Sequence, residues 1–319
     1  MAQDLHDWLA DPERQRLTQR AIDRFGAEWD RGGVHARFDS AMAGLPEPSE
    51  WAVAEAVRGL FGDDDWVDAL VGGLAEGLRR DPFFDPPFRH INSDLHSGLI
   101  AFEDERVTIA AGVTPVAQLA ARKSSARSAT SVGFTGRVTV LKFIKAGGAR
   151  LSFWSAPPIT AAFSAADAGR CTRDRELHIA DGDIVTIDGR RQSYVVDYAR
   201  SNLVILQAEI IVGEAPVSVE YDSASGAYLG CSATRDSASR IQMIATLLRK
   251  LDCAGAFGPI AAFLEHPDFF VRWHVMKELL GIDAEAAMPH LKRMAARDPH
   301  PETRRAARSV LDRIEAPPA

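Results

Sequence analysis

Long apolar runs are missing from this 319-residue sequence, and none approaches the roughly 18 residues that a membrane-spanning helix requires. The first residues, from Met1 to Trp8, are acidic and lack the basic and apolar segments of a secretory signal peptide. Only three cysteines are present, Cys171, Cys231 and Cys253, and they form no CxxC pair. We therefore expect buried thiols in a reducing compartment, and a cytoplasmic protein without a membrane segment.

Strong positive charge is also missing. The formal net charge of −7 gives no general attraction to nucleic acid or to an anionic membrane. The phosphate-binding signatures GxxxxGK[ST] and GxGxxG after a strand are absent, as is the GxSxG nucleophile elbow. These absences leave no motif from which to argue a common enzymatic activity. The apolar fraction of 46% and the charged fraction of 25% are those of a globular chain.

The first part of the chain, residues 1–88, has the pattern of helices. Apolar residues recur at helical spacing from Leu17 to Trp29, and Ser49 can cap a second helical stretch. Pro82, Pro86 and Pro87 end this region, because proline cannot continue a helix.

From about residue 97 the pattern changes to short β-rich runs separated by turn residues. The pairs Gly147-Gly148 and Asp188-Gly189 lie between runs and suit tight hairpins. The stretch from Arg122 to Gly136 is rich in Ser, Thr and Gly, and we expect a mobile loop there. Many short strands with such turns indicate an antiparallel sandwich or a small barrel. The predicted strands cover residues 99–102, 106–110, 138–144, 150–154, 183–187, 192–196, 203–211 and 217–221.

One β-rich stretch, LHIADGDIVTIDG from Leu177 to Gly189, followed by QSYVV, resembles a cupin, a small double-stranded jelly roll. In cupins a Gly-Asp pair opens a strand, a turn follows, and a metal-binding histidine comes next. Here Gly182-Asp183 opens the strand, and Ser193 occupies the histidine position. The His-x-His pair of the other cupin motif has no counterpart between Val138 and Trp154. The resemblance therefore implies a jelly roll without the usual metal, serving as a binding pocket or a scaffold.

The predicted pocket residues of this jelly roll are Trp154, Gln192 and Tyr194, provided that their strands face inward. An apolar pocket with a few polar groups is the usual form of a small-ligand site. We expect a small-molecule or peptide ligand there.

A rival interpretation centres on His90, Asp94 and His96, just before the first long strand. In an extended segment these three share one side, and they could form a face of two histidines and one carboxylate for a divalent metal. This alternative implies a metal-dependent enzyme of the cupin kind, an oxygenase or an isomerase. The other explanation of the segment is a polar loop, in which Asn92 and Asp94 make turn hydrogen bonds and no cofactor is bound.

The last third of the chain contains an internal repeat. Segments that start at Thr234, His266 and Asp298 superpose at a spacing of 32 residues. A unit of two helices cannot bury its apolar face alone, so such units stack on one another. The aligned positions are Arg240, Arg272 and Arg304, together with Leu247, Leu279 and Leu311.

This repeat resembles the short bacterial form of the HEAT repeat, through the run DPHPETRRAA from Asp298 and HPDFFVR from His266. In the family, the Asp and the Arg of the motif order adjacent repeats. His266 replaces the acidic residue, which puts that link in doubt at its junction. Helical solenoids mostly bind partners, so the resemblance implies a protein partner.

The last helical hairpin is locally basic, which offers a nucleic-acid alternative. A charged run on a helix is more often a solvated face, and with an acidic chain we consider nucleic acid an unlikely partner. The basic residues are Lys292, Arg293, Arg297, Arg304, Arg305, Arg308 and Arg313.

The sequence thus predicts an α+β multidomain protein. Its parts are an N-terminal helical region (1–88), a cupin-like antiparallel jelly roll (89–232) and HEAT-like helical repeats (233–319). The favoured function is that of a non-enzymatic binding or regulatory protein, with a ligand-binding or scaffold jelly roll and a protein partner bound through residues 233–314. The metal-dependent enzyme and the nucleic-acid binder remain as alternatives.

Overall fold

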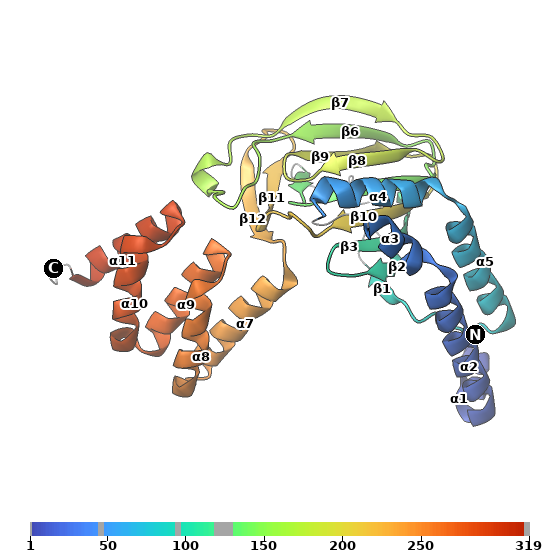
Figure 1. The fold of residues 1–319 in the computed structure, drawn as a ribbon, viewed down its shortest axis with the longest axis horizontal. Helices are drawn as coiled ribbons and strands as arrows, with labels where there is room; N and C mark the ends of the chain where they lie inside the picture. Colours follow the sequence, from blue (N-terminus) through green and yellow to red (C-terminus); the bar gives the residue numbers. More distant parts are fainter. Residues whose placement is uncertain (1, 44–47, 93–96, 118–129, 316–319) are drawn as a thin grey trace.

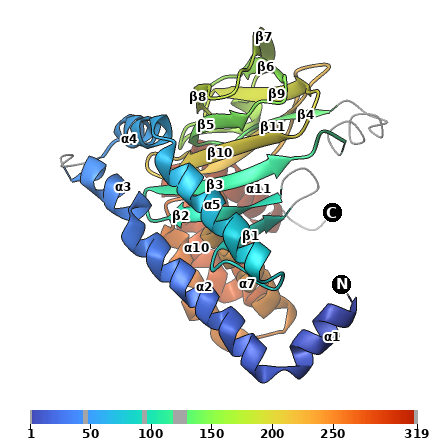
Figure 2. The ribbon, with the colours of Figure 1, turned by 90° about the vertical axis from the view of Figure 1, so that its right-hand side faces the viewer.

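The computed structural model describes residues 2–43, 48–92, 97–117 and 130–315. Helices come first, strands second and helices last, so the predicted α+β arrangement is confirmed (Figure 1). Figure 2 shows the first helices along one side of the β-rich centre. These helices are α1 (Ala2–Ala10), α2 (Pro12–Gly32), α3 (Val34–Met42), α4 (Glu50–Gly62) and α5 (Asp65–Arg80).

The centre of the molecule is a jelly roll of antiparallel strands. One sheet has six strands in the order β1 (Arg89–Asn92), β2 (Ser97–Glu103), β3 (Val107–Thr114), β10 (Leu203–Ile210), β5 (Val138–Lys145) and β8 (Ile184–Asp188). A three-stranded sheet has the order β7 (Thr172–His178), β6 (Arg150–Ser155) and β9 (Gln192–Tyr198). The other has the order β12 (Tyr228–Ala233), β11 (Val217–Asp222) and β4 (Ser131–Phe134), and its β4 lies beside β9.

The strand order identifies this centre as a jelly roll. From β3 to β10, successive strands alternate between the six-stranded sheet and the layer formed by β4, β9, β6 and β7, with β6 and β7 as the one hairpin within a layer. Such alternation between two sheets is the pattern of the eight-stranded jelly roll. The short 3-10 helix η1 (Ala165–Asp167) lies between β6 and β7 in the chain.

Several local expectations are wrong, and the sheet order explains why. Gly147 and Gly148 have φ values of 59° and 67°, which glycine adopts readily. They connect β5 to β6, which lie in different sheets, so the turn is a crossover rather than a hairpin. The pair Asp188-Gly189 likewise leads from one sheet to the other. Within the predicted mobile loop, residues 122–129 lie outside the described residues, whereas Ser131–Phe134 forms β4.

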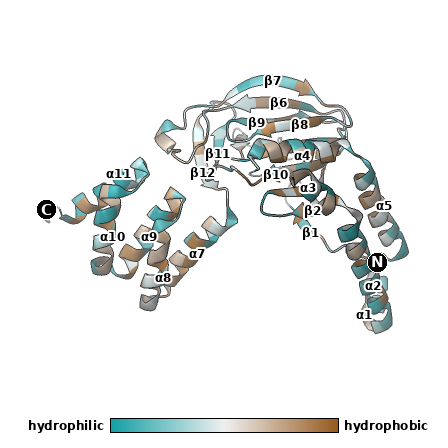
Figure 3. Ribbon diagram, in the orientation of Figure 1, coloured by the Kyte–Doolittle hydropathy of each residue, from teal (hydrophilic) through white to brown (hydrophobic). Residues whose placement is uncertain are grey.

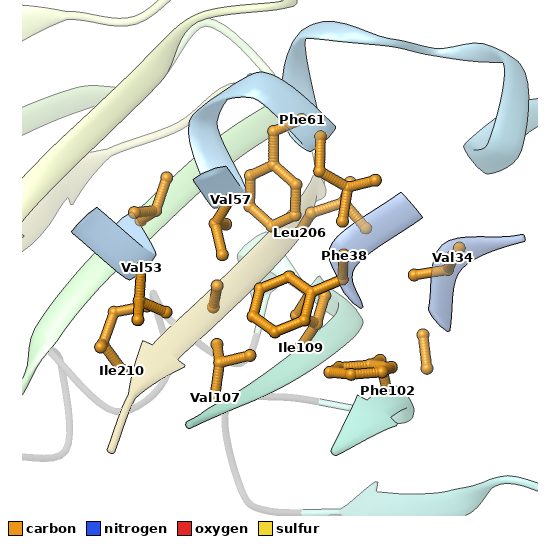
Figure 4. Packing of buried hydrophobic residues seen from close by; sticks show 14 of the residues in the cluster. Val34, Phe38, Val53, Val57, Phe61, Phe102, Val107, Ile109, Leu206 and Ile210 are labelled. Carbon is orange, nitrogen blue, oxygen red and sulfur yellow. The ribbon is translucent and has the colours of Figure 1, made fainter. Parts of the chain in front are cut away.

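The N-terminal helices share a hydrophobic core with the six-stranded sheet. Val53, Val57 and Phe61 recur every four residues along α4, which places them on one helix face. Figure 4 shows this face against Leu206 and Ile210 of β10. Alternation along the strand then directs the intervening residues of β10 to the other face of the sheet. On that face Ile205 packs in a second cluster with Leu151 and Phe153 of β6, so the sheet is covered on both faces.

The C-terminal helices form a separate hydrophobic cluster. Val271, Val275 and Leu279 of α9 lie at its centre and are fully buried. Helix α9 packs against α7 on one side and against α10 on the other, and α11 packs on α10. The elements are α7 (Asp236–Lys250), η2 (Ala254–Ala256), α8 (Phe257–Ala261), η3 (Ala262–Glu265), α9 (Phe269–Ile282), α10 (Ala284–Arg297) and α11 (Pro301–Glu315).

Coloured by hydropathy, the outer helices are mixed rather than uniformly apolar (Figure 3). Accordingly, none of the helices within the described residues is both long and apolar enough to cross a membrane.

We predict that Phe61→Ala lowers the free energy of unfolding by about 3–5 kcal/mol, because it leaves a cavity between α4 and the sheet. Urea denaturation measures the change. The control is Trp51→Ala on the exposed face of the same helix, where Trp51 is 49% exposed and the cost should be only about 0.5 kcal/mol. Similar losses for the two variants would show that α4 does not depend on its contact with the sheet.

Candidate functional site

A cavity lies inside the jelly roll, on the face of the six-stranded sheet that the helices do not cover. Leu206, Ala208 and Ile210 of β10 pack under the helices, so the alternate residues Gln207 and Glu209 face the interior. The cavity has a volume of about 200 Å³. It is lined by Ile91, Ser97, Gly98, Ala110, Ala111, Gly112, Thr114, Tyr194, Ile205, Gln207 and Glu209.

The cavity exists because neighbouring positions carry small side chains. Ala110 of β3 pairs with Gln207 of β10, and Gly98 of β2 pairs with Gly112 of β3. A Cβ atom on Gly98 would come within 2.2 Å of the carbonyl oxygen of Ala111. This close backbone approach requires glycine at that position.

Tyr194 reaches the same cavity from β9, in the opposite layer. Burial raises the pKa of the Tyr194 hydroxyl to about 12, and the negative charge of Glu209 contributes to the rise. The phenol therefore stays protonated at neutral pH and can both donate and accept a hydrogen bond.

A partly buried guanidinium holds the polar wall of the cavity. Arg137 donates from Nη1 to Glu209 Oε2 (2.9 Å), from Nε to Glu214 Oε2 (2.7 Å) and from Nη2 to the carbonyl oxygen of Thr234 (2.8 Å). Burial alone would lower the pKa of Arg137, but the hydrogen bonds and charges of Glu214 and Glu209 outweigh it and raise that pKa. Gln207 Nε2 also donates to Glu209, at Oε1 (2.9 Å).

A second hollow of about 500 Å³ adjoins the cavity and shares Ile91, Ala110, Gln207 and Glu209 with it. Its lining includes Thr234, Arg235 and Asp236, at the start of α7. Arg235 Nε donates to Glu214 Oε1 (2.5 Å), so the buried Glu214 carboxylate lies between two guanidiniums. The open space thus leads from the jelly-roll interior to the first helix of the repeat stack.

The structure brings one of the three predicted pocket residues to this cavity. Tyr194 lines it, as described. Trp154 pairs with Ser193 across the strands and packs in another cluster, with its Nε1 donating to Ser152 Oγ (3.2 Å). Gln192 is exposed at the start of β9. The sequence reasoning did not select Gln207, Glu209 or Arg137, although the alternation in LVILQAEI was a usable signal.

Two of the three predicted metal ligands cannot be placed. Asp94 and His96 lie outside the described residues. His90 is exposed on β1, and its Nε2 lies 3.2 Å from Asp85 Oδ1. Elsewhere in the part of the chain that the structure describes, no group of three His, Cys, Asp or Glu residues could hold a metal ion. The metal site therefore stays a prediction of the sequence.

The jelly-roll interior itself does not fit the metal ligands that the cupin resemblance would supply. On β5, where the His-x-His pair would stand, Leu141 and Phe143 are fully buried in the inner hydrophobic cluster. On β9 the Ser193 hydroxyl donates to the carbonyl oxygen of Gly133. These side chains fill space or bond to the backbone, so we derive no metal chemistry from the described residues of the interior.

The expectation of three buried thiols is wrong for two of them. Cys171 is buried, and burial raises the pKa of its thiol. Cys231 is exposed on β12, an edge strand, and Cys253 is exposed in the turn after α7. Periodicity does not reveal such positions, because short edge and turn segments have no buried face.

The polar link between repeats is present at one junction. Arg272 donates from Nε to Asp298 Oδ2 (2.9 Å) and from Nη2 to Asp298 Oδ1 (2.8 Å), and both side chains are buried. At the preceding junction His266 replaces the acid. Arg240 is exposed there and forms no ion pair with any described residue. The sequence put the polar link at this junction in doubt, and among the described residues Arg240 makes no such link.

Helices α7 and α9 are connected by a different polar cluster. Glu278 accepts a hydrogen bond from Thr246 Oγ1 (3.0 Å) and pairs with Arg249. His274 Nε2 lies 2.8 Å from Thr246 Oγ1. Burial lowers the pKa of His274, while the nearby Glu278 partly opposes this and Lys277 adds to it. His274 is therefore held in its neutral form between the two helices.

An apolar stripe lies along the exposed face of α7 and ends at Leu251, the residue that follows the helix. We use "α7 stripe" for its exposed residues Met243, Ile244, Leu247 and Leu251, which are 55–70% exposed. The buried Ala238 and Ala245 instead belong to the hydrophobic cluster of the C-terminal helices. A hollow of about 630 Å³ lies beside the stripe, lined by Ser239, Gln242, Met243, Ile244, Thr246, Leu247, Lys250 and His274.

Several basic side chains of the last hairpin bond to neighbouring residues. Arg304 donates to the carbonyl oxygens of Asp298 and Pro299, and Arg308 to that of Ala295. Lys292 pairs with Glu315. These contacts hold the hairpin together, and the nucleic-acid alternative remains untested.

We predict that the stability of the repeat stack falls as the pH is lowered from about 7.5 to about 5.5, across the ordinary histidine pKa of about 6.5. The lowered pKa of His274 gives stability that is fully present above the unfolded pKa and is lost as the pH falls towards the folded one. Thermal melts of wild type and His274→Gln measure this, and the variant should lose less. His178→Gln, at an exposed strand position, should behave as wild type. An unchanged slope in His274→Gln would contradict the prediction.

Comparison with known proteins adds to this picture. A family model of HEAT repeats matches residues 231–312. No curated protein matches the chain. Among solved structures, ectoine synthase from P. lautus is 10% identical and covers 38% of this chain and 67% of its own, with a TM-score of 0.22. A cupin domain from Bordetella pertussis Tohama I is 11% identical and covers 38% of this chain and 97% of its own, with a TM-score of 0.21.

The 7S globulin of Momordica charantia is 14% identical and covers 44% of this chain and 36% of its own, with a TM-score of 0.26. These likenesses include cupin-type proteins, while the jelly-roll assignment itself rests on the strand order described above. The family match confirms the predicted HEAT repeats in the C-terminal part of the chain.

Proposed function

We propose that this chain is a binding and regulatory protein, in which the jelly roll holds a small ligand and the HEAT repeats hold a protein partner. One observation carries the first half: a cavity of about 200 Å³ in which Tyr194, Gln207 and Glu209 converge among mostly small or apolar residues. Few polar groups in a concave, otherwise apolar site are the usual form of a small-molecule site.

The partner surface that we propose is the α7 stripe. Its residues run from Met243 to Leu251, the residue directly after the helix, over about 12 Å, which suits an apposed helix of similar length. Arg240 and Lys250 are exposed near its two ends and make no ion pair with the described residues. This arrangement favours an amphipathic helix whose apolar face is flanked by carboxylates.

The linkage between the two sites supports a regulatory role. Arg137 contacts Glu209 in the cavity wall and the carbonyl oxygen of Thr234, two residues before α7. A ligand that alters the position of Glu209 would thereby act on the start of the helix that carries the proposed partner surface.

We predict that Ala110→Leu abolishes small-ligand binding without unfolding the protein, because the added carbons fill the cavity that Ala110 leaves open. Thermal melts in the presence of separate small amines, alcohols, amides and carboxylates provide the measurement, since a bound ligand raises the melting temperature. The matched control is Ala296→Leu on the exposed side of α10, which should respond to ligands as wild type does. Equal ligand responses in Ala110→Leu and wild type would rule out the cavity as the site.

We predict that Leu247→Asp weakens binding of an acidic amphipathic helix by about tenfold or more, because it places a like charge in the centre of the apolar contact. Fluorescence anisotropy with a synthetic peptide of about 18 residues, leucines on one face and glutamates beside them, measures the affinity. Val71→Asp, at an exposed apolar position on α5, is the control. Equal affinity for a peptide with lysines in place of the glutamates would contradict the charge argument.

A further inference from the structure

Gln207 and Glu209, the two neighbouring polar side chains of β10 in the cavity wall, offer hydrogen-bond acceptors to a ligand. Glu209 Oε2 accepts from Arg137, and Glu209 Oε1 accepts from the Gln207 amide nitrogen. Because the Gln207 NH₂ group points to Glu209, its carbonyl oxygen is the end left for a ligand. A carboxylate has capacity for about four hydrogen bonds, so Glu209 also retains acceptor capacity. A ligand with several donors would match this set.

The charges point the same way. All three nitrogens of Arg137 already donate to protein oxygens, at Glu214, Glu209 and Thr234. Within this cluster two carboxylates face one guanidinium. The balancing Arg235 pairs with the far side of Glu214, and its side chain is 47% exposed. The counter-charge of Glu209, Arg137, is therefore shared with Glu214, in a partly buried setting where charges interact more strongly than in bulk water.

The remaining walls suit a short apolar body. Ile205 and Ala110 lie beside Gln207, and Ile91 completes this side. The Tyr194 ring lies in the same lining, and an aromatic face attracts a cation placed over it. Tyr194 and Glu209 are close enough for the carboxylate charge to act on the hydroxyl.

We propose that the cavity binds a small primary ammonium compound with a short apolar chain. The ammonium group donates to Glu209 and to the Gln207 carbonyl oxygen beside the Tyr194 ring, and the chain packs on Ile205 and Ala110. This inference rests on the proposed function of the cavity and names its ligand class.

The test uses n-butylammonium, 1-butanol and butanoate as probes at matched ionic strength, with affinity measured by calorimetry and by thermal melts of the full chain. We expect n-butylammonium to bind and the uncharged and anionic probes to bind at least about tenfold more weakly, as for the loss of one charged hydrogen bond. Glu209→Gln should weaken n-butylammonium binding by about tenfold or more and leave any weak 1-butanol binding unchanged.

Because Glu209 also pairs with Arg137, Glu209→Gln could impair folding, and Tyr194→Phe and Gln207→Leu provide variants that leave Arg137 untouched. Gln207→Leu should weaken n-butylammonium binding by several-fold, and its circular dichroism and melting temperature verify the fold. Equal or tighter binding of 1-butanol or butanoate overturns the ammonium assignment while leaving the cavity as a ligand site. If Ala110→Leu changes the binding of neither the probes nor any other small compound, the proposed function fails together with this inference.

Discussion

The hydrogen-bonded pairing of Arg137 with two glutamates is the interaction on which the arrangement of this molecule depends. Arg137 immediately precedes β5, Glu209 belongs to β10, and Glu214 lies in the loop that leads to β11. A partly buried guanidinium is favourable only when its charge is matched and its donors are used. Since its third nitrogen donates to Thr234, the same side chain also fixes where the repeat stack leaves the jelly roll.

A second constraint is that the six-stranded sheet is buried on both faces. Its outer face needs the apolar residues of α3 and α4, and its inner face needs the opposite layer. Lys142, a charged residue of β5, is buried on the face that the helices cover. It donates to the carbonyl oxygen of Phe61 at the end of α4 (2.6 Å) and pairs with Asp64. A cation at a helix C-terminus is favourable because the carbonyl groups there carry partial negative charge. The N-terminal helices and the strands thus stabilise each other through one core.

The sequence revealed those parts of this fold that have a strong period. The 32-residue repeat predicted the HEAT helices, and most β-rich runs became strands close to the predicted bounds. Strand β7 was missed because its residues, TRDRELH, are polar and exposed on a sheet edge. The turn at Gly147-Gly148 was read as a hairpin because local sequence does not say which sheet the next strand joins. The prediction of the site met the same limit. Trp154 and Tyr194 have similar chemistry but lie on opposite faces of one layer. The alternation of residues along a strand does not say which of these faces encloses the cavity.

The position of the cavity relative to the repeat stack has a thermodynamic consequence. The larger hollow that adjoins it is lined by Asp236, the first residue of α7, and the α7 stripe begins two turns further along the same helix. If a ligand at Glu209 and a partner on α7 both act through the contacts of Arg137 and Arg235 with Glu214, each must change the affinity of the other by the same factor. The buried Glu214, shared by both guanidiniums, is then the residue through which that coupling passes. Under the proposed function, ligand binding in the jelly roll and partner binding on the helical stack are therefore thermodynamically linked.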